Sequence, residues 1–158
     1  MAHEYRADVV WIRGDQPFVD RRYSRAHVWR FDGGVEVPAS SSPLSVKLPL
    51  SRPDAVDPEE ALVAAVSSCH MLFFLDFAAH AGFVVDRYDD AAVGVMSKNE
   101  GGKLFISKIT LNPMVTFSGA KRPSDQDIDG LHHRAHEECY IANSVRAEVV
   151  VAARHSVA

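Results

Sequence analysis

The sequence of 158 residues is poor in cysteine and in net charge, and it shows neither internal repeats nor low-complexity segments. It contains 17 Lys and Arg against 21 Asp and Glu, and the resulting net charge of −4 gives no reason to expect nucleic-acid binding. The opening stretch "MAHEYRADVV" has no charged segment followed by an apolar one, so no secretory signal is predicted. We therefore expect a cytoplasmic protein that binds neither nucleic acid nor a membrane.

The two cysteines lie far apart in the sequence. Cys69 falls within the apolar run "VAAVSSCHMLFFLDFAAH", and Cys139 follows 70 residues later in "HRAHEECYIANSV". In a reducing compartment such a pair is more often catalytic, redox-sensing or metal-binding than a permanent disulfide. Burial as a small hydrophobic side chain is the simplest alternative for Cys69. A reactive cysteine needs a lowered pKa, and in mid-helix Cys69 would need a cation from elsewhere in the fold.

The first half of the chain predicts strands followed by a long helix. Val, Trp, Tyr and Phe recur in residues 4–13 and 23–39, and "FDGGVEV" supplies an Asp-Gly-Gly hairpin turn. A segment with four prolines and several serines, residues 40–58, predicts a loop. Asp57 is the expected N-cap of a helix that runs to about Ala81.

The second half predicts strands, a second helix and a final strand. Residues 91–119 indicate two or three strands, with "NEGGK" as a hairpin turn. Ser124 is the expected N-cap of the second helix, and residues 144–153 indicate the last strand. This order of elements, in a chain of one-domain length, predicts a single α+β domain over residues 1–158.

The first helix is too apolar for one small subunit to cover. Its uncharged stretch Ala61–Leu75 has 15 residues, which is short for a membrane span and more typical of a buried helix. A helix that is apolar on most sides packs in a large core or at a subunit interface. We therefore expect a homodimer.

A metal site is an alternative use of the second helix. His132 and His136 are four residues apart and Cys139 is three beyond, which places all three near one helix face. The other interpretation is a solvated face of histidines and glutamates.

Two stretches resemble the OsmC/Ohr family (osmotically inducible protein C and organic hydroperoxide resistance protein). They are "DPEEALVAAVSSCHMLFFLDFAAHAGF" and "HHRAHEECYIANSV", in which Glu59, Cys69 and Cys139 fit the family's spacing. The resemblance covers about residues 56–151, and the N-terminal third is closer to the uncharacterised OsmC-like branch. It implies antiparallel sheets wrapped around two central helices in an intertwined homodimer.

The resemblance also implies a function, the reduction of organic hydroperoxides by thiols. Cys69 would attack the peroxide, Cys139 would resolve the sulfenic acid as a disulfide, and an external dithiol, such as a dihydrolipoyl group, would reduce it. The family pairs the glutamate with an arginine that supplies the cation. Glu59 matches that glutamate, and Arg25 is the expected arginine, with Arg22 and Arg30 as rivals.

Three functions remain open from the sequence: a thiol peroxidase, a non-catalytic protein that binds an apolar ligand in the same cleft, and a metal-binding protein using His132, His136 and Cys139. For the peroxidase, helix geometry adds a constraint. Glu59 and Cys69 are separated by ten residues, about 15 Å along a straight helix. The sequence therefore predicts a site shared between two chains, with Cys69 and Cys139 from one and Glu59 and Arg25 from the other.

Overall fold

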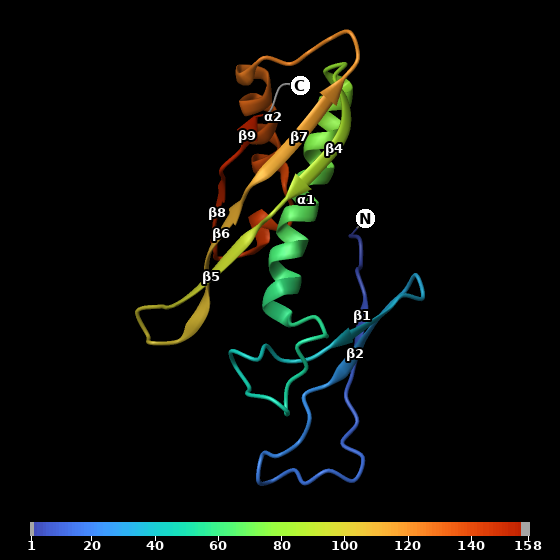
Figure 1. The fold of residues 1–158 in the computed structure, drawn as a ribbon, viewed down its shortest axis with the longest axis vertical. Coiled ribbons are helices and arrows are strands. Elements are labelled where there is room, and N and C mark those ends of the chain that lie inside the picture. The colour runs from blue at the N-terminus through green and yellow to red at the C-terminus, as the bar shows by residue number, and fades with distance from the viewer. Residues whose placement is uncertain (1, 156–158) are drawn as a thin grey trace. The chain divides into compact units, whose positions relative to one another are not determined.

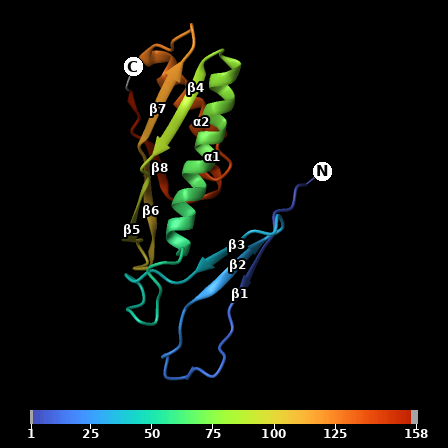
Figure 2. The ribbon, with the colours of Figure 1, turned by 45° about the vertical axis from the view of Figure 1, so that its right-hand side comes forward.

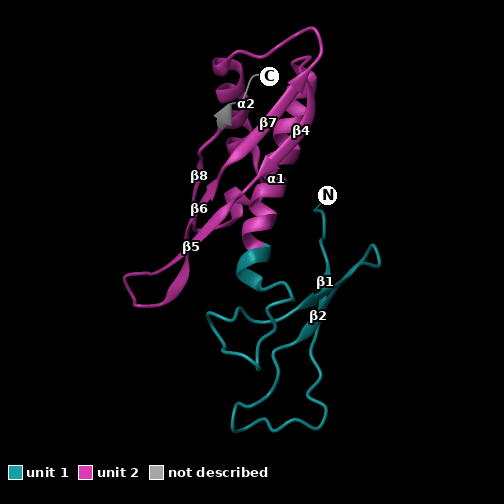
Figure 3. Cartoon of the chain, viewed as in Figure 1, with its two compact units in different colours: residues 1–61 teal, residues 62–158 magenta. Residues whose placement is uncertain are grey.

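The computed structural model describes residues 2–155, and these fall into two compact units (Figure 3). Unit 1 is residues 1–61 and unit 2 is residues 62–158. The single domain expected from the sequence stays a prediction. The α+β class is confirmed, because two α-helices alternate with groups of strands along the chain.

Unit 1 contains one antiparallel sheet in the order β1-β2-β3 (Figure 2). Its strands are β1 (Ala7–Val10), β2 (His27–Phe31) and β3 (Glu36–Ala39). The predicted hairpin is confirmed between β2 and β3, where Gly34 takes a φ of 81° that other residues rarely adopt. The sheet buries little, since Ala39 is its only hydrophobic residue in the buried class.

The proline-rich loop after β3 returns to the strand it leaves. Ser40 N–H donates to the Val56 carbonyl at 3.0 Å, and Val56 N–H donates to the Pro38 carbonyl at 3.0 Å. These two bonds close the loop at its base, so the start of the following helix is fixed next to the end of β3.

Helix α1 (Pro58–His80) begins and ends where the sequence indicates. Asp57 Oδ1 accepts from the Glu60 N–H at 2.8 Å, and Glu60 Oε2 accepts from the Asp57 N–H at 3.3 Å, a reciprocal capping box. At the other end Gly82, with φ 77°, lets the chain turn away, and Phe83 N–H closes the last turn on the Ala78 carbonyl.

Only one face of α1 is buried. The buried residues Val66, His70, Phe74 and Ala78 recur every four positions, whereas Leu72 is 60% exposed. With 23 residues, α1 is long and apolar enough to cross a membrane by length and composition, and 22% of its most apolar stretch is buried. The core helix of a soluble protein meets the same criterion. The composition of α1 therefore does not show whether lipid or protein covers its exposed face.

Unit 2 contains two three-stranded sheets, β4-β7-β9 and β5-β6-β8. The strands are β4 (Val84–Asp90), β5 (Val93–Lys98), β6 (Leu104–Leu111), β7 (Pro113–Ser118), β8 (Glu148–Val151) and β9 (Arg154–His155). Strand β4 was not predicted from the sequence, because its "VVDRYDD" is mostly polar and its register shifts at a bulge. The sheets are antiparallel as expected, except that β8 and β9 pair in parallel with β6 and β7.

The core of unit 2 lies where α1, β7 and α2 meet (Figure 1). Helix α2 (Asp125–Glu138) begins at Ser124 with a second capping box, closed by Asp127, and a short 3₁₀ turn η1 (Ala142–Ser144) follows it. The main cluster contains Phe74 from α1, Phe117 from β7 and Leu131 from α2. A second cluster joins α1 to β6 through Val66 and Ile109, and this packing holds the middle of α1 in place.

Candidate functional site

The structure brings Cys69 and Cys139 together in unit 2. Cys69 is half-buried on α1, and Cys139 is fully buried directly after α2. Cys69 lies near enough to raise the pKa of the Cys139 thiol, and neither cysteine is in a disulfide. Two sulfurs that are 70 residues apart in sequence therefore form one local pair.

Cys139 is held by the turn that follows α2. As the C-cap of α2 it leaves helical geometry (φ −63°, ψ 107°), which directs the thiol toward α1. The thiol donates to the Val66 carbonyl at 3.9 Å and accepts from the Ala142 N–H at 3.4 Å. Asn143 Nδ2 donates to the Cys139 carbonyl at 3.1 Å and closes the turn. The residues "IAN" thus fix the position of the second sulfur.

Burial raises the pKa of the Cys139 thiol to about 11, while the Ala142 N–H opposes the rise and the hydrogen bond and charge of Cys69 add to it. Cys139 is therefore a neutral thiol at neutral pH. Cys69 is the more accessible sulfur, so chemically the pair offers one sulfur to an external oxidant and a second thiol within reach of it.

The metal site considered from the sequence is not formed. Within residues 2–155, no group of three or more His, Cys, Asp or Glu side chains could hold a metal ion. The helix ends before Cys139, so its thiol turns toward Cys69 and Val66, and the His132 ring hydrogen-bonds to His70. The assumption that the helical spacing continues through Cys139 was wrong.

A buried histidine pair replaces that cluster and was missed by sequence analysis. His70 Nε2 and His132 Nδ1 are 3.0 Å apart, the rings stack at 8°, and both side chains are buried. Burial lowers the pKa of His70 to about 4, and the charge of His136 lowers it further while Asp90 opposes the shift. His70 is therefore neutral at pH 7, and the pair ties α1 to α2 one residue away from Cys69. In the sequence, His70 is four residues from both Val66 and Phe74, and this spacing was the available signal that it lies on the buried face of α1.

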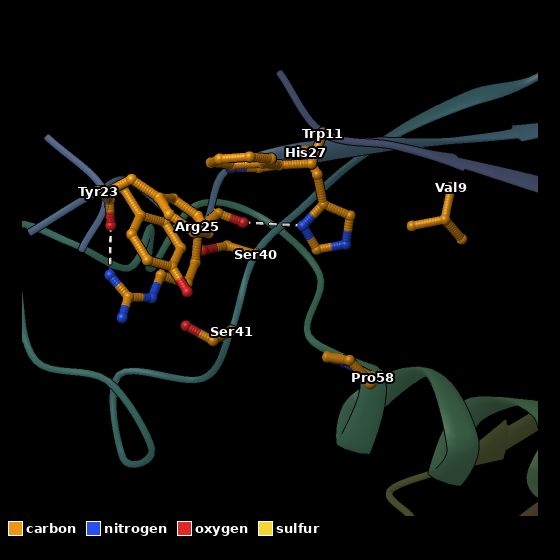
Figure 4. A pocket seen from close by; sticks show the side chains of 9 residues that line it. Val9, Trp11, Tyr23, Arg25, His27, Ser40, Ser41 and Pro58 are labelled. Atoms are coloured by element: carbon orange, nitrogen blue, oxygen red, sulfur yellow. Dashed lines mark hydrogen bonds between the residues drawn. The ribbon is translucent and has the colours of Figure 1, made fainter. Parts of the chain in front are cut away.

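Arg25 lines a separate cavity of about 430 Å³ in unit 1 (Figure 4). The walls are mainly apolar and aromatic, from β1, β2, the loops beside them and the start of α1. The lining residues are Val9, Trp11, Phe18, Tyr23, Arg25, His27, Ser40, Ser41 and Pro58. A cation therefore lies in an apolar pocket, the kind of environment in which a charge acts strongly.

The guanidinium of Arg25 is fixed from two directions. It donates to the Arg21 carbonyl at 3.0 Å and to the Tyr23 carbonyl, and it lies 3.9 Å from the centroid of the Tyr23 ring. None of its contacts among residues 2–155 is an ion pair. The positive charge is thus oriented without being neutralised.

The backbone of Arg25 is fixed by His27. Trp29 Nε1–H can only donate, and it lies 3.0 Å from His27 Nε2, which must therefore carry a lone pair. His27 Nδ1 then carries the proton and donates to the Arg25 carbonyl at 2.8 Å (Figure 4). The Arg25 N–H donates to the Leu50 carbonyl at 2.8 Å. This role of His27 was not predicted from the sequence, where its position two residues after Arg25 was the available signal.

The two alternative arginines, Arg22 and Arg30, are less suited to supply a free cation in the cavity. Arg30 is engaged with Glu36 across the hairpin at 2.5 Å, and Arg22 contributes only its backbone N–H, to Asp20. Neither lines the cavity. Glu59, half-buried in the first turn of α1, makes no side-chain ion pair or hydrogen bond within the described chain. The expected contact between Glu59 and Arg25 is therefore not formed inside one chain.

Comparison with known proteins places these features in a family. Residues 51–154 match the model of the OsmC-like protein family. An OsmC-like protein of unknown function from Vibrio cholerae O1 biovar eltor is 50% identical, with a TM-score of 0.95 over 97% of this chain and 100% of that chain.

Two more distant structures share the fold. The organic hydroperoxide resistance protein OsmC of Legionella pneumophila has a TM-score of 0.66 at 14% identity, over 99% of both chains. The organic hydroperoxide resistance protein OhrB of Bacillus subtilis has a TM-score of 0.61 at 16% identity, over 98% of both chains. The chain matches no curated protein sequence.

Proposed function

Because the chain belongs to the OsmC-like protein family, we propose that it is a cysteine-based peroxidase that reduces organic hydroperoxides. The observation that carries the proposal is that half-buried Cys69 lies near enough to buried Cys139 to raise its pKa, while both cysteines are free. Some structural relatives are named for resistance to organic hydroperoxides, which agrees with this chemistry.

The reaction proceeds in three balanced steps. The Cys69 thiolate attacks the distal oxygen of R–O–OH, the O–O bond breaks, and the products are a sulfenic acid and an alkoxide that takes up a proton to become ROH. The Cys139 thiol then attacks the sulfenic sulfur, and a disulfide and water form. An external dithiol reduces that disulfide by exchange and leaves as its own cyclic disulfide.

The surroundings of Cys139 suit the second role. Its raised pKa keeps it protonated during the first step, so it does not place a second negative charge beside the Cys69 thiolate. Its burial and its neutral charge also keep Cys139 from attacking the peroxide directly, since a neutral, inaccessible thiol is a poor nucleophile toward a peroxide that it cannot reach. Cys69 therefore acts first and Cys139 second.

Arg25 supplies the cation that stabilises the Cys69 thiolate and the developing alkoxide. Its guanidinium has no neutralising partner among residues 2–155 of its own chain, and its cavity is apolar, so the charge is weakly screened. The apolar walls favour a peroxide with an organic group over hydrogen peroxide, which has no apolar surface to bury. Glu59 and Arg25 do not touch in the described chain, so a bidentate contact between them, which lysine could not reproduce, would form only when the dimer assembles the site.

The active unit is a homodimer in which each site draws on both chains. Helix α1 continues unbroken from Pro58 to His80, so Glu59 and Cys69 lie about 15 Å apart along its axis and about 80° apart around it. Exposed apolar residues occur in both units, for example Val9 at 66% and Leu72 at 60%. A second copy covers them and brings its own Arg25 and Glu59 to Cys69.

A peroxidase assay tests the reaction. The reduced protein consumes cumene hydroperoxide catalytically with dihydrolipoamide or dithiothreitol as the dithiol. Cys69→Ser abolishes consumption, whereas Cys139→Ser, assayed without added dithiol, consumes one equivalent and then accumulates the sulfenic acid, which mass spectrometry detects. Absence of turnover in the wild-type protein with both dithiols would contradict the proposal.

A mixing experiment tests the shared site. A Cys69→Ser chain and a Glu59→Ala chain are each inactive, and they are co-refolded or co-expressed. If sites are shared, each heterodimer has one doubly defective site and one intact site, so part of the activity returns. If each site lies within one chain, the mixture stays inactive.

A non-catalytic ligand-binding protein is the second candidate function. It is favoured by the cavity of unit 1, whose apolar walls contain neither cysteine. Under this alternative an apolar ligand binds the wild-type protein and Cys69→Ser equally, and hydroperoxide is not consumed.

A further inference from the structure

The cavity of unit 1 is walled by three aromatic rings that pack on one another. Phe18 and Tyr23 stack with centroids 4.8 Å apart at 26°, and Trp11 lies 5.4 Å from Tyr23 at 67° and 5.9 Å from Phe18 at 46°. These spacings lie in the range that aromatic pairs prefer. The wall is therefore formed by rings that hold each other in place.

The aromatic wall is already ordered without a ligand, and part of its surface is exposed to solvent. Trp11 Nε1–H donates to the Ser24 carbonyl at 2.8 Å, so the indole has its polar group satisfied and its orientation fixed. Phe18 keeps 49% of its surface exposed, although a phenyl ring gains from burial. The wall thus has apolar ring surface available to a ligand, and little side-chain entropy remains to be lost when it binds.

The cation lies directly against this wall. The Arg25 guanidinium covers the Tyr23 ring at 3.9 Å and lines the same cavity as Trp11 (Figure 4). Phe18 lines that cavity as well. A ligand whose oxygen reaches the guanidinium therefore has its neighbouring carbon group against aromatic rings. The cavity of about 430 Å³ is at the small end of ligand pockets.

From these contacts we infer that the cavity receives a flat aromatic group attached close to the peroxide, so that aryl hydroperoxides are the preferred substrate class. A ring can stack on Phe18 and contact the edge of Trp11, and it is rigid. A linear alkyl chain gains no stacking and loses rotational freedom when it is ordered. The inference rests on the proposed peroxidase function, and it assigns selectivity to Trp11, Phe18 and Tyr23.

Two substrates that differ only by the ring provide the test. Cumene hydroperoxide and tert-butyl hydroperoxide share a tertiary carbon, and a phenyl group in the first replaces a methyl group in the second. The wild-type kcat/KM is expected to be about tenfold or more higher for cumene hydroperoxide, from the apolar area removed from water. In Phe18→Ala this ratio falls by about fivefold or more, and in Trp11→Phe, which keeps a ring, it falls less.

The matched control is Phe31→Ala. Phe31 is a 40% exposed ring on β2 that does not line the cavity, so its removal leaves the ratio unchanged. Since Phe18 is half-exposed, Phe18→Ala is not expected to unfold the protein, and its thermal midpoint verifies this. A wild-type ratio near one, or a ratio that Phe18→Ala and Phe31→Ala change equally, would overturn the inference.

A binding measurement separates this inference from the proposed function. Cumyl alcohol, the product, is titrated into Cys69→Ser and followed by calorimetry and by Trp fluorescence. Binding that is weakened about tenfold by adding Phe18→Ala supports the aryl site even if the wild-type protein consumes no hydroperoxide. Turnover of both substrates without binding of cumyl alcohol, or a preference for linoleic acid hydroperoxide, retains the peroxidase and overturns the aryl site.

Discussion

The thiols of Cys69 and Cys139 in unit 2 lie at a packed hydrophobic core, whereas the guanidinium of Arg25 in unit 1 is held by hydrogen bonds and an aromatic ring. Among the residues whose burial the structure describes, Ala39 is the only buried hydrophobic residue outside unit 2, and unit 1 buries mainly Ser40, Ser51 and Asp57. Cys139 is fully buried beside the cluster of Val66 and Ile109. Arg25 instead depends on carbonyls and on the ring of Tyr23.

This difference between the units indicates that unit 2 supplies most of the folding stability, while unit 1 positions a charged side chain. A core element resists opening because many apolar contacts must be lost together, while a hydrogen-bonded loop with little core opens at a low free-energy cost. The sulfurs need a fixed, dry environment, and the cation needs an orientation that can adapt to a substrate. Apart from the two cysteines, we expect substitutions in the core of unit 2 to act mainly on folding and substitutions around the cavity of unit 1 to act mainly on activity.

The largest expected contrast is between two phenylalanines. Phe74 is fully buried and stacks with His132 at 4.3 Å, so Phe74→Ala should lower the free energy of unfolding by about 3–5 kcal/mol. Phe18 in unit 1 is 49% exposed, so Phe18→Ala should lower it by about 1 kcal/mol or less. Urea denaturation measures both, and equal losses would contradict the division between the units.

The next effect is a pH dependence that originates in unit 2. The folded pKa of His70 is about 4, below the ordinary 6.5, so between these values the unfolded chain binds a proton that the folded chain does not. The stability contribution is therefore complete above pH 6.5 and is lost as the pH falls toward 4, by about 3 kcal/mol.

This dependence is measured by comparing variants across the pH range. His70→Phe should flatten the fall in the free energy of unfolding between pH 6.5 and 4. His133→Gln changes an exposed histidine of α2 and should leave the slope as in the wild type. Parallel curves for the wild type and His70→Phe would show that the buried histidine pair is not the source.

The third effect tests unit 1 on activity. Arg25→Ala should lower kcat/KM for cumene hydroperoxide by about a hundredfold, and Arg25→Lys by about tenfold, because lysine keeps the charge and loses the fork. Neither should change the unfolding midpoint by much. Arg22→Lys, on the same loop but outside the cavity, is the control. A similar loss of activity in that control would reassign the cation.

The smallest effect compares the two helix caps. Asp57→Ala at the start of α1 and Ser124→Ala at the start of α2 each remove a capping box, and each should cost about 1 kcal/mol of stability. Only Asp57→Ala should also lower activity, because Asp57 precedes Glu59 and lies in the unit that contains Arg25. Thermal unfolding and the peroxidase assay on the same samples distinguish the two results.

Local signals predicted most elements of the fold. Pro58 after Asp57, Gly82 after an apolar run and Ser124 before acidic residues each act within one helical turn, so the helix ends are legible in the sequence. β4 was missed because its polar residues and bulge hide the alternation. The parallel pairing of β8 and β9 could not be read, since it depends on partners distant in the chain.

Site prediction succeeded for residue types and failed for neighbours. The spacing of Glu59, Cys69 and Cys139 pointed to the family that residues 51–154 match. The same reasoning assigned His132 and His136 to a possible metal site with Cys139. It could not show that the helix ends one residue before Cys139 or that His132 hydrogen-bonds to His70.

The sequence by itself determined the α+β class, the helix boundaries, the apolar character of α1 and the two cysteines as candidates for chemistry. These features depend on residues within a few positions of one another, where backbone geometry determines which side chains lie on the same face. Only the tertiary structure decided that Cys139 is buried against Cys69, that His70 pairs with His132, and that Trp11, Phe18 and Tyr23 surround Arg25. Each of these contacts joins separate segments, and packing between segments decides which side chains become neighbours and how their pKa values shift.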